Sequence, residues 1–261
     1  MKAKTGRYLG TLAMLAFTGL VQAEIAAHRP TLTVLWPQNA QSSQAHAEIT
    51  HSGLAEAVID MAEQRMALKS PVTLVLGGGG EPRINTRSQV IVMPYEHLQH
   101  IKDDLKISTG QNVADTSVAL DAFVYSMVHQ LAHVAITQQE ETGQWLGEDA
   151  VADLTMLTLL EHMPNGDRIA QNALSLFDKH AIGLNRSKSN YWASHSLNAE
   201  RYWSGICQLH GSGRSFDEVM PAEQMSDAEC GDHYALLRNS WAQMFAEGLE
   251  PLAENANVAS R

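Results

Sequence analysis

The chain has 261 residues and is acidic, with 29 Asp and Glu against 18 Lys and Arg and a formal net charge of −11 at pH 7. This length is enough for one or two domains with a proper hydrophobic core. An acidic chain without a basic patch argues against nucleic acid as a partner.

Residues 1–23 have the pattern of a secretory signal peptide. Three basic residues precede an apolar run over residues 9–21, and Ala23 is a small residue suited to cleavage. Cleavage before Glu24 leaves 15 basic against 29 acidic residues, a net charge of −14. No later stretch reaches the roughly 18 apolar residues of a membrane span. We therefore expect a periplasmic or secreted protein with no membrane segment after signal cleavage.

The first part of the mature chain predicts three strands and one helix. Residues 24–50 are polar apart from a β-branched run at 31–36, which predicts a strand. Apolar residues at helical spacing predict a helix over 53–68. Two further β-branched runs predict strands at 72–76 and 89–93.

A run of four glycines, Gly77–Gly80, follows the second predicted strand. A glycine run after a strand is typical of a phosphate loop, but such a loop continues with Gly-Lys-Ser/Thr. No such residues follow here, so we interpret the run as a flexible connection. The next segment, 97–111, is mixed and polar and gives no clear prediction.

The chain is organised around a predicted helix that contains the pentad His129-Gln130-Leu131-Ala132-His133. Its apolar residues recur every three and four positions: Leu120, Phe123, Val124, Met127, Val128 and Leu131. Two histidines four residues apart project from one helix face. This spacing offers two imidazoles to one tetrahedral zinc. The alternative is two polar residues that are solvated or satisfied by hydrogen bonds.

A second apolar-periodic helix follows and carries Glu148, Asp149 and Asp153 near its start. A carboxylate there would complete a metal site with the layout His-Glu-x-x-His followed by a downstream acid. Alternatively, the acids only favour the helix N-terminus. One residue departs from the layout, because Gln130 occupies the position of the catalytic glutamate.

The C-terminal part predicts three more helices. They cover residues 167–182, residues 197–209, and a last segment that opens with a capping box at 226–229 and includes Phe245. The tail 251–261 is expected to be disordered. Residues 24–250 therefore predict one α+β domain, with a small early sheet followed by a mainly helical part.

Cys207 and Cys230 are the only cysteines of the chain. In an exported protein an isolated pair most often forms a disulfide. The alternative is two free thiols that contribute to metal binding.

These features together resemble a family of exported bacterial zincin-like proteins described as "putative metallopeptidase". The pentad and residues 148–153 carry the core of the resemblance. Its outer parts are the strand pair that ends in Tyr95-Glu96, the C-terminal His195-Ser196-Leu197, and Arg201, Cys207, Gly211, Cys230 and Trp241. The sequence departs from the family at Gln130, in lacking cysteines near the strand pair, and in a displaced or shortened downstream acid.

The resemblance implies a zincin-like fold in which zinc is bound by His129, His133 and a carboxylate. In related zincins the ligand acid lies four residues before an aspartate that supports a ligand histidine. Counting back from Asp153 gives Asp149, which is the first choice, with Glu148 as the alternative.

Gln130 bears on whether the site performs chemistry. A zincin glutamate takes a proton from zinc-bound water and delivers it to the leaving amine, whereas an amide has no basic oxygen for this. Loss of a general base typically costs about 10²–10⁴ in rate. His195 is the other catalytic candidate, as a donor to an oxyanion or bound ligand; otherwise it is a capping or surface histidine.

Two functions stay open on this basis. The first is an exported zinc metallopeptidase-like protein, a candidate pseudoenzyme with attenuated or lost peptide hydrolysis. The second is a non-enzymatic periplasmic binding protein on a degenerate zincin fold without metal. Either would take a peptide or protein as its ligand.

Overall fold

The computed structural model describes residues 30–37, 39–66, 68–85, 87–109, 116–139, 148–183, 199–213 and 227–244. The predicted signal peptide (1–23) and tail (251–261) lie outside the described residues. Within this described part, no helix is long and apolar enough to cross a membrane.

The described elements are those of an α+β protein, as predicted. The strands are β1 (Thr31–Val34), β2 (Thr73–Leu76), β3 (Arg83–Asn85) and β4 (Val90–Met93). The helices are α1 (Ala40–Ser52), α2 (Leu54–Arg65), α3 (Tyr95–Thr109), α4 (Thr116–Gln139), α5 (Glu148–Leu160), α6 (Gly166–Gly183), α7 (Ala199–Gly211) and α8 (Asp227–Met244).

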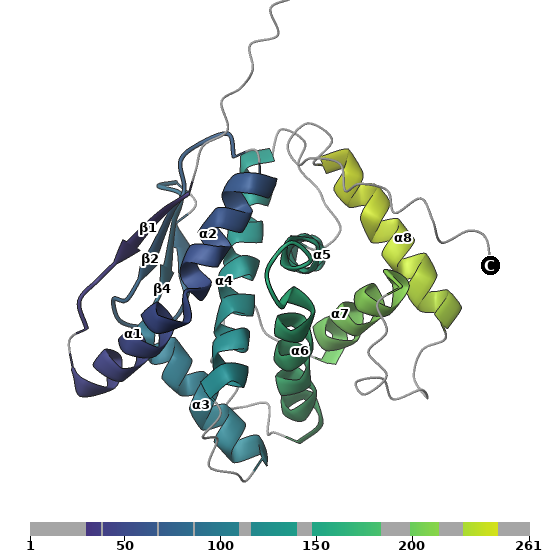
Figure 1. Ribbon diagram of the computed structural model, residues 1–261. Helices are drawn as coiled ribbons and strands as arrows, with labels where there is room; N and C mark the ends of the chain where they lie inside the picture. Colours follow the sequence, from purple (N-terminus) through teal and green to yellow (C-terminus); the bar gives the residue numbers. More distant parts are fainter. Residues whose placement is uncertain are drawn as a thin grey trace, which may run out of the picture.

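The four strands form one sheet in the order β1-β2-β4-β3. Strands β1, β2 and β4 are parallel to one another, while the edge strand β3 is antiparallel to β4. Side chains alternate between the two faces, with Ile91 and Met93 fully buried in the core and Val90 and Val92 only half-buried. Figure 1 shows α2 and α4 beside the sheet.

Helices α1 and α3 and strand β3 were missed by the sequence analysis. Helix α1 is polar and buries only Ser42, Ala45 and Ile49, so it lacks a clear apolar stripe. Its start is set by Asn39, whose side chain accepts a hydrogen bond from the Ser42 N–H at 2.8 Å. The prediction of a small early sheet followed by a mainly helical part agrees with the structure, in which α1 as well as the predicted α2 lies between β1 and β2.

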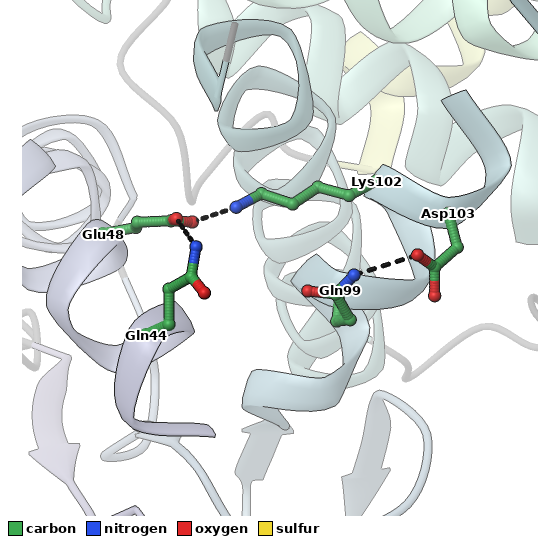
Figure 2. A network of polar contacts seen from close by, with 5 residues as sticks. All are labelled: Gln44, Glu48, Gln99, Lys102 and Asp103. Atoms are coloured by element: carbon green, nitrogen blue, oxygen red, sulfur yellow. Dashed lines mark hydrogen bonds and ion pairs between the residues drawn. The ribbon is translucent and has the colours of Figure 1, made fainter. Parts of the chain in front are cut away.

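Polar side chains join α1 to α3, as Figure 2 shows. Lys102 of α3 forms an ion pair with Glu48 of α1, and Gln44 donates to the same carboxylate at 3.0 Å. A second bond, from Gln99 to Asp103 at 2.9 Å, lies within α3. Because these groups are partly or fully exposed, we expect them to contribute little to stability.

Helix α4 is the central element of the fold. Every residue from 121 to 136 is buried, and the helix contacts α2, α3, α5 and α6 as well as the sheet. Figure 1 shows α4 between the sheet and the C-terminal helices. A helix surrounded in this way is hydrophobic on all sides, so each polar residue on it needs a partner inside the protein.

Cys207 of α7 and Cys230 of α8 form the predicted disulfide. The two helices approach closely beside it, because a Cβ at Gly211 would lie 2.5 Å from Tyr234 and 2.7 Å from the Cys230 carbonyl oxygen. Closing a loop of this size contributes roughly 3 kcal/mol in the chain-entropy model.

Candidate metal site

The pentad lies in the buried part of α4 and not on a solvated face. His129 and Gln130 are each 5% exposed, and His133 is 6% exposed. Burial of two imidazoles is unfavourable unless their nitrogens have partners. The geometry of these partners defines the candidate site.

The two imidazoles point toward one another. His129 Nε2 and His133 Nε2 are 3.0 Å apart, and the rings are perpendicular with centroids 4.6 Å apart. Two nitrogens on one tetrahedral zinc are about 3.4 Å apart, given Zn–N distances of about 2.1 Å. The histidine pair therefore fits a shared metal after a shift of a few tenths of an ångström.

Asp153 of α5 lies on the opposite edge of the His129 ring. Its Oδ1 atom is 3.0 Å from His129 Nδ1, and the residue is 2% exposed. The negative charge of the carboxylate at this distance favours a ring proton on Nδ1, although the two atoms are not aligned for a hydrogen bond. A proton on Nδ1 leaves the lone pair on Nε2, which faces His133. A carboxylate beside the second ring nitrogen is the usual support for a histidine that binds a metal. The role of Asp153 in metal binding stays a prediction.

The third predicted ligand is not decided by the described side chains. Asp149 and Glu148 form the first turn of α5, one turn before Asp153, but their side chains lie outside the described part, as does all of His195. Among the described residues, no group of three His, Cys, Asp or Glu side chains is placed to hold a metal ion. The choice of Asp149 over Glu148 remains a prediction.

Gln130 lies next to His129 in the same buried turn. Its neutral amide can donate and accept hydrogen bonds but does not accept a proton near neutral pH. Asp153 does not replace it, because its carboxylate faces Nδ1 of His129 and not the Nε2 pair.

A third buried histidine, which was not predicted from the sequence, packs against α4. His97 of α3 is 1% exposed, and its Nε2 lies 3.1 Å from the Ser126 hydroxyl, one turn before Gln130. Ser126 donates its own proton to the Ala122 carbonyl at 2.9 Å, so His97 donates to Ser126. Burial, and secondarily the nearby His100, lower the pKa of His97 to about 3, which keeps the ring neutral.

Asp121, near the start of α4, was also missed. This carboxylate is fully buried and accepts hydrogen bonds from Arg168 at 3.1 Å and from Asn172 at 2.6 Å, both on α6. In the sequence, Asp121 is recognisable only as an acidic residue within an apolar stripe. That pattern does not reveal its partners, which lie 47 and 51 residues later in the chain.

Two buried histidines whose Nε2 atoms converge on the central helix of an α+β fold offer two ligands to one metal ion. A family model described as "Putative metallopeptidase" matches residues 35–245, and the chain belongs to this family. No match was found among curated proteins or among solved structures. The family resemblance seen in the sequence is confirmed, and it supports a metallopeptidase-like protein.

Proposed function

We propose that this chain is an exported protein that resembles zinc metallopeptidases and has a zincin-like fold. We further propose that its peptide hydrolysis is attenuated or lost. The observation that carries this proposal is the convergence of His129 Nε2 and His133 Nε2 at 3.0 Å, with Asp153 behind His129. Family membership supports the metallopeptidase-like part of the proposal and suggests a metal.

His129, His133 and either Asp149 or Glu148 would hold the zinc. A bound zinc polarises a peptide carbonyl and lowers the pKa of a water molecule. Asp153 orients the His129 ring through Nδ1, at 3.0 Å. Because α4 and α5 pack side by side, one helix supplies the imidazoles and the other supplies their support.

Gln130 is the reason to propose attenuated hydrolysis. The amide can orient a water molecule or a peptide group by hydrogen bonding, but it offers no basic oxygen for the transferred proton. The expected loss relative to a glutamate is about 10²–10⁴ in rate. His195 is retained as a possible donor to bound ligand, on the basis of the family pattern alone.

The metal-free alternative also has an observation in its favour. A separation of 3.0 Å between two ring nitrogens matches an N–H···N hydrogen bond, so the histidines can satisfy one another without metal. In that case the protein would be a periplasmic binding protein that takes a peptide or protein ligand without cleaving it.

The deciding experiment is the metal content of purified mature protein, measured by elemental mass spectrometry after exposure to zinc and dialysis. We expect about one zinc per chain, and we expect His133→Ala to remove most of it because two remaining ligands make a poor tetrahedral site. His51→Ala, at an exposed position on α1, is the matched control and should keep the metal.

Two outcomes would contradict the proposal. Zinc content that His133→Ala leaves unchanged would place the metal elsewhere in the chain. Folded wild-type protein that retains no zinc would favour the metal-free binding protein.

A further inference from the structure

The hairpin formed by β3 and β4 carries a pocket of about 540 Å³. Its lining includes Arg83 and Asn85 of β3, Arg87 and Ser88 of the turn, and Val90 and Val92 of β4. Arg83 lies opposite Val92, and Asn85 lies opposite Val90. The four strand residues lie on the sheet face opposite Ile91 and Met93, which are buried in the core that α4 shares. Ile84 also lines the pocket, and it pairs with Ile91 and packs against that core. The pocket shares no lining residue with the candidate metal site.

The polar groups that line this pocket are hydrogen-bond donors. Two of them are guanidinium groups, which are always protonated. The Asn85 side-chain oxygen already accepts from the N–H groups of Arg87 and Ser88, both at 3.1 Å, which leaves its NH₂ group as a donor. Ser88 adds a hydroxyl. Among the residues that the structure describes there, no Asp or Glu lines the pocket.

Arg83 is held in place by the glycine turn that precedes it. Its Nη1 atom donates to the Gly79 carbonyl at 2.8 Å and to the Glu81 carbonyl at 3.3 Å. Gly77 has φ +107°, and a Cβ there would lie 2.9 Å from the Tyr95 ring, so this turn requires glycine. A guanidinium fixed in this way loses less entropy when it binds an anion.

The charge of this pocket is opposite to that of the protein. The whole chain carries a net charge of −11, yet two arginines lie in this hollow, and in the described part of the chain neither forms an ion pair with a carboxylate. Guanidinium groups bind carboxylate and phosphate through paired, charge-assisted hydrogen bonds. The two valines offer an apolar surface for a short aliphatic body.

We propose that this pocket is a binding site for a small dianion that carries carboxylate or phosphate groups. Arg83 and Arg87 neutralise the two charges, the Asn85 amide and Ser88 hydroxyl donate further hydrogen bonds, and the valines contact the carbon skeleton. The site does not depend on zinc or on peptide hydrolysis.

The test uses the full mature protein at low ionic strength, titrated by calorimetry with succinate, with inorganic phosphate, and with neutral succinamide. The test variant is Arg83→Gln/Arg87→Gln. The control is Lys69→Gln/Lys106→Gln, which removes the same charge at two exposed lysines outside the pocket. We expect saturable binding of at least one anion and a loss of at least about 10-fold in affinity in the arginine variant. The lysine variant should stay within about 2-fold of wild type, because exposed charges outside the pocket are screened.

Binding of phosphate alone would identify a phosphate ligand, and binding of succinate alone would identify a carboxylate. If the arginine variant fails to fold, the wild type is titrated with the same anions and followed by NMR. Saturable shifts of the Arg87 and Ser88 amide signals then test whether the anion binds in this pocket. Absence of saturable binding up to about 10 mM, equal binding of succinamide, or equal losses in both variants would overturn the proposal.

Discussion

Two buried carboxylates, Asp121 on α4 and Asp153 on the neighbouring α5, have different partners. Asp121 accepts hydrogen bonds from the Arg168 guanidinium and the Asn172 amide, at 3.1 and 2.6 Å. Asp153 lies 3.0 Å from the His129 imidazole. The guanidinium and the amide NH₂ group that bind Asp121 remain hydrogen-bond donors at any pH near neutrality. An imidazole, in contrast, can exchange its proton or bind a metal.

This difference separates a structural group from a candidate functional one. Asp121 fixes α6 against α4, and nothing about its partners varies with conditions near neutral pH. Asp153 instead acts on a ring whose other nitrogen faces His133. Both residues are buried aspartates, so the chemistry of the partner decides the role.

Arg168→Ala should produce the largest effect and should act on stability alone. It leaves the Asp121 charge buried with a neutral amide, and removal of one partner of a buried ion pair costs about 3–5 kcal/mol. Because the Arg168 side chain is 51% exposed, we expect the lower end, about 3 kcal/mol. Denaturant unfolding measures this loss.

The double variant Arg168→Ala/Asp121→Asn is the control for that interpretation. It removes the stranded charge and should recover part of the lost stability. A double variant that is less stable than Arg168→Ala would show that the carboxylate contributes something other than the ion pair. Zinc content per folded chain should be unchanged in both.

Gln130→Glu adds a carboxylate to α4, next to His129, and should raise turnover. By the general-base range we expect a gain of roughly 10²-fold in turnover on an unstructured peptide, with little change in KM. The measurement is hydrolysis of casein or a quenched peptide by zinc-loaded protein. Gln130→Glu/His133→Ala, which should lack metal, is the matched control and should lose the gain.

Two results would count against this reading of Gln130. If both proteins bind zinc and neither cleaves, the loss of activity reaches beyond Gln130. If wild type cleaves rapidly and a chelator stops it, another residue is the base.

His97 tests a buried histidine whose Nε2 lies 3.1 Å from a hydroxyl group, that of Ser126. Its pKa is lowered to about 3 in the fold, against about 6.5 in the unfolded chain, so between these values the unfolded state binds the extra proton. Stability contributed by this group is therefore present above pH 6.5 and is lost as the pH falls, by roughly 2 kcal/mol at pH 5. His97→Gln should lose less stability than wild type between pH 7 and pH 5 in urea unfolding. An equal loss in both proteins would contradict the assignment.

Asp153→Asn should have the smallest effect and should act on the metal. Asparagine is nearly isosteric with aspartate, so the fold should tolerate the change, but without the negative charge the ring becomes a weaker ligand. Loss of such a supporting group typically costs 10–100-fold in metal affinity, and we expect about 10-fold. Competition with a chromogenic chelator measures this. Affinity equal to that of wild type would remove Asp153 from the site.

The elements that are rich in apolar or β-branched residues could be predicted from the amino-acid sequence alone. The strands β1, β2 and β4 and the helices α2 and α4 to α8 were predicted within a few residues. The helical spacing of His129 and His133 could also be recognised in the sequence. The disulfide could be predicted because the chain has only two cysteines. The family resemblance followed from the same residues.

The contacts between polar residues could not be predicted from the sequence. Helix α1 has a weak apolar stripe in a mostly polar sequence, and β3 has only three residues. Neither segment therefore has a local sequence pattern that predicts its secondary structure. The contacts of Asp121 with α6, of His97 with Ser126 and of Asp153 with His129 join residues 24 to 51 positions apart. Such contacts depend on how helices pack around α4, and a buried charge or imidazole finds its partner only when that packing brings the two together.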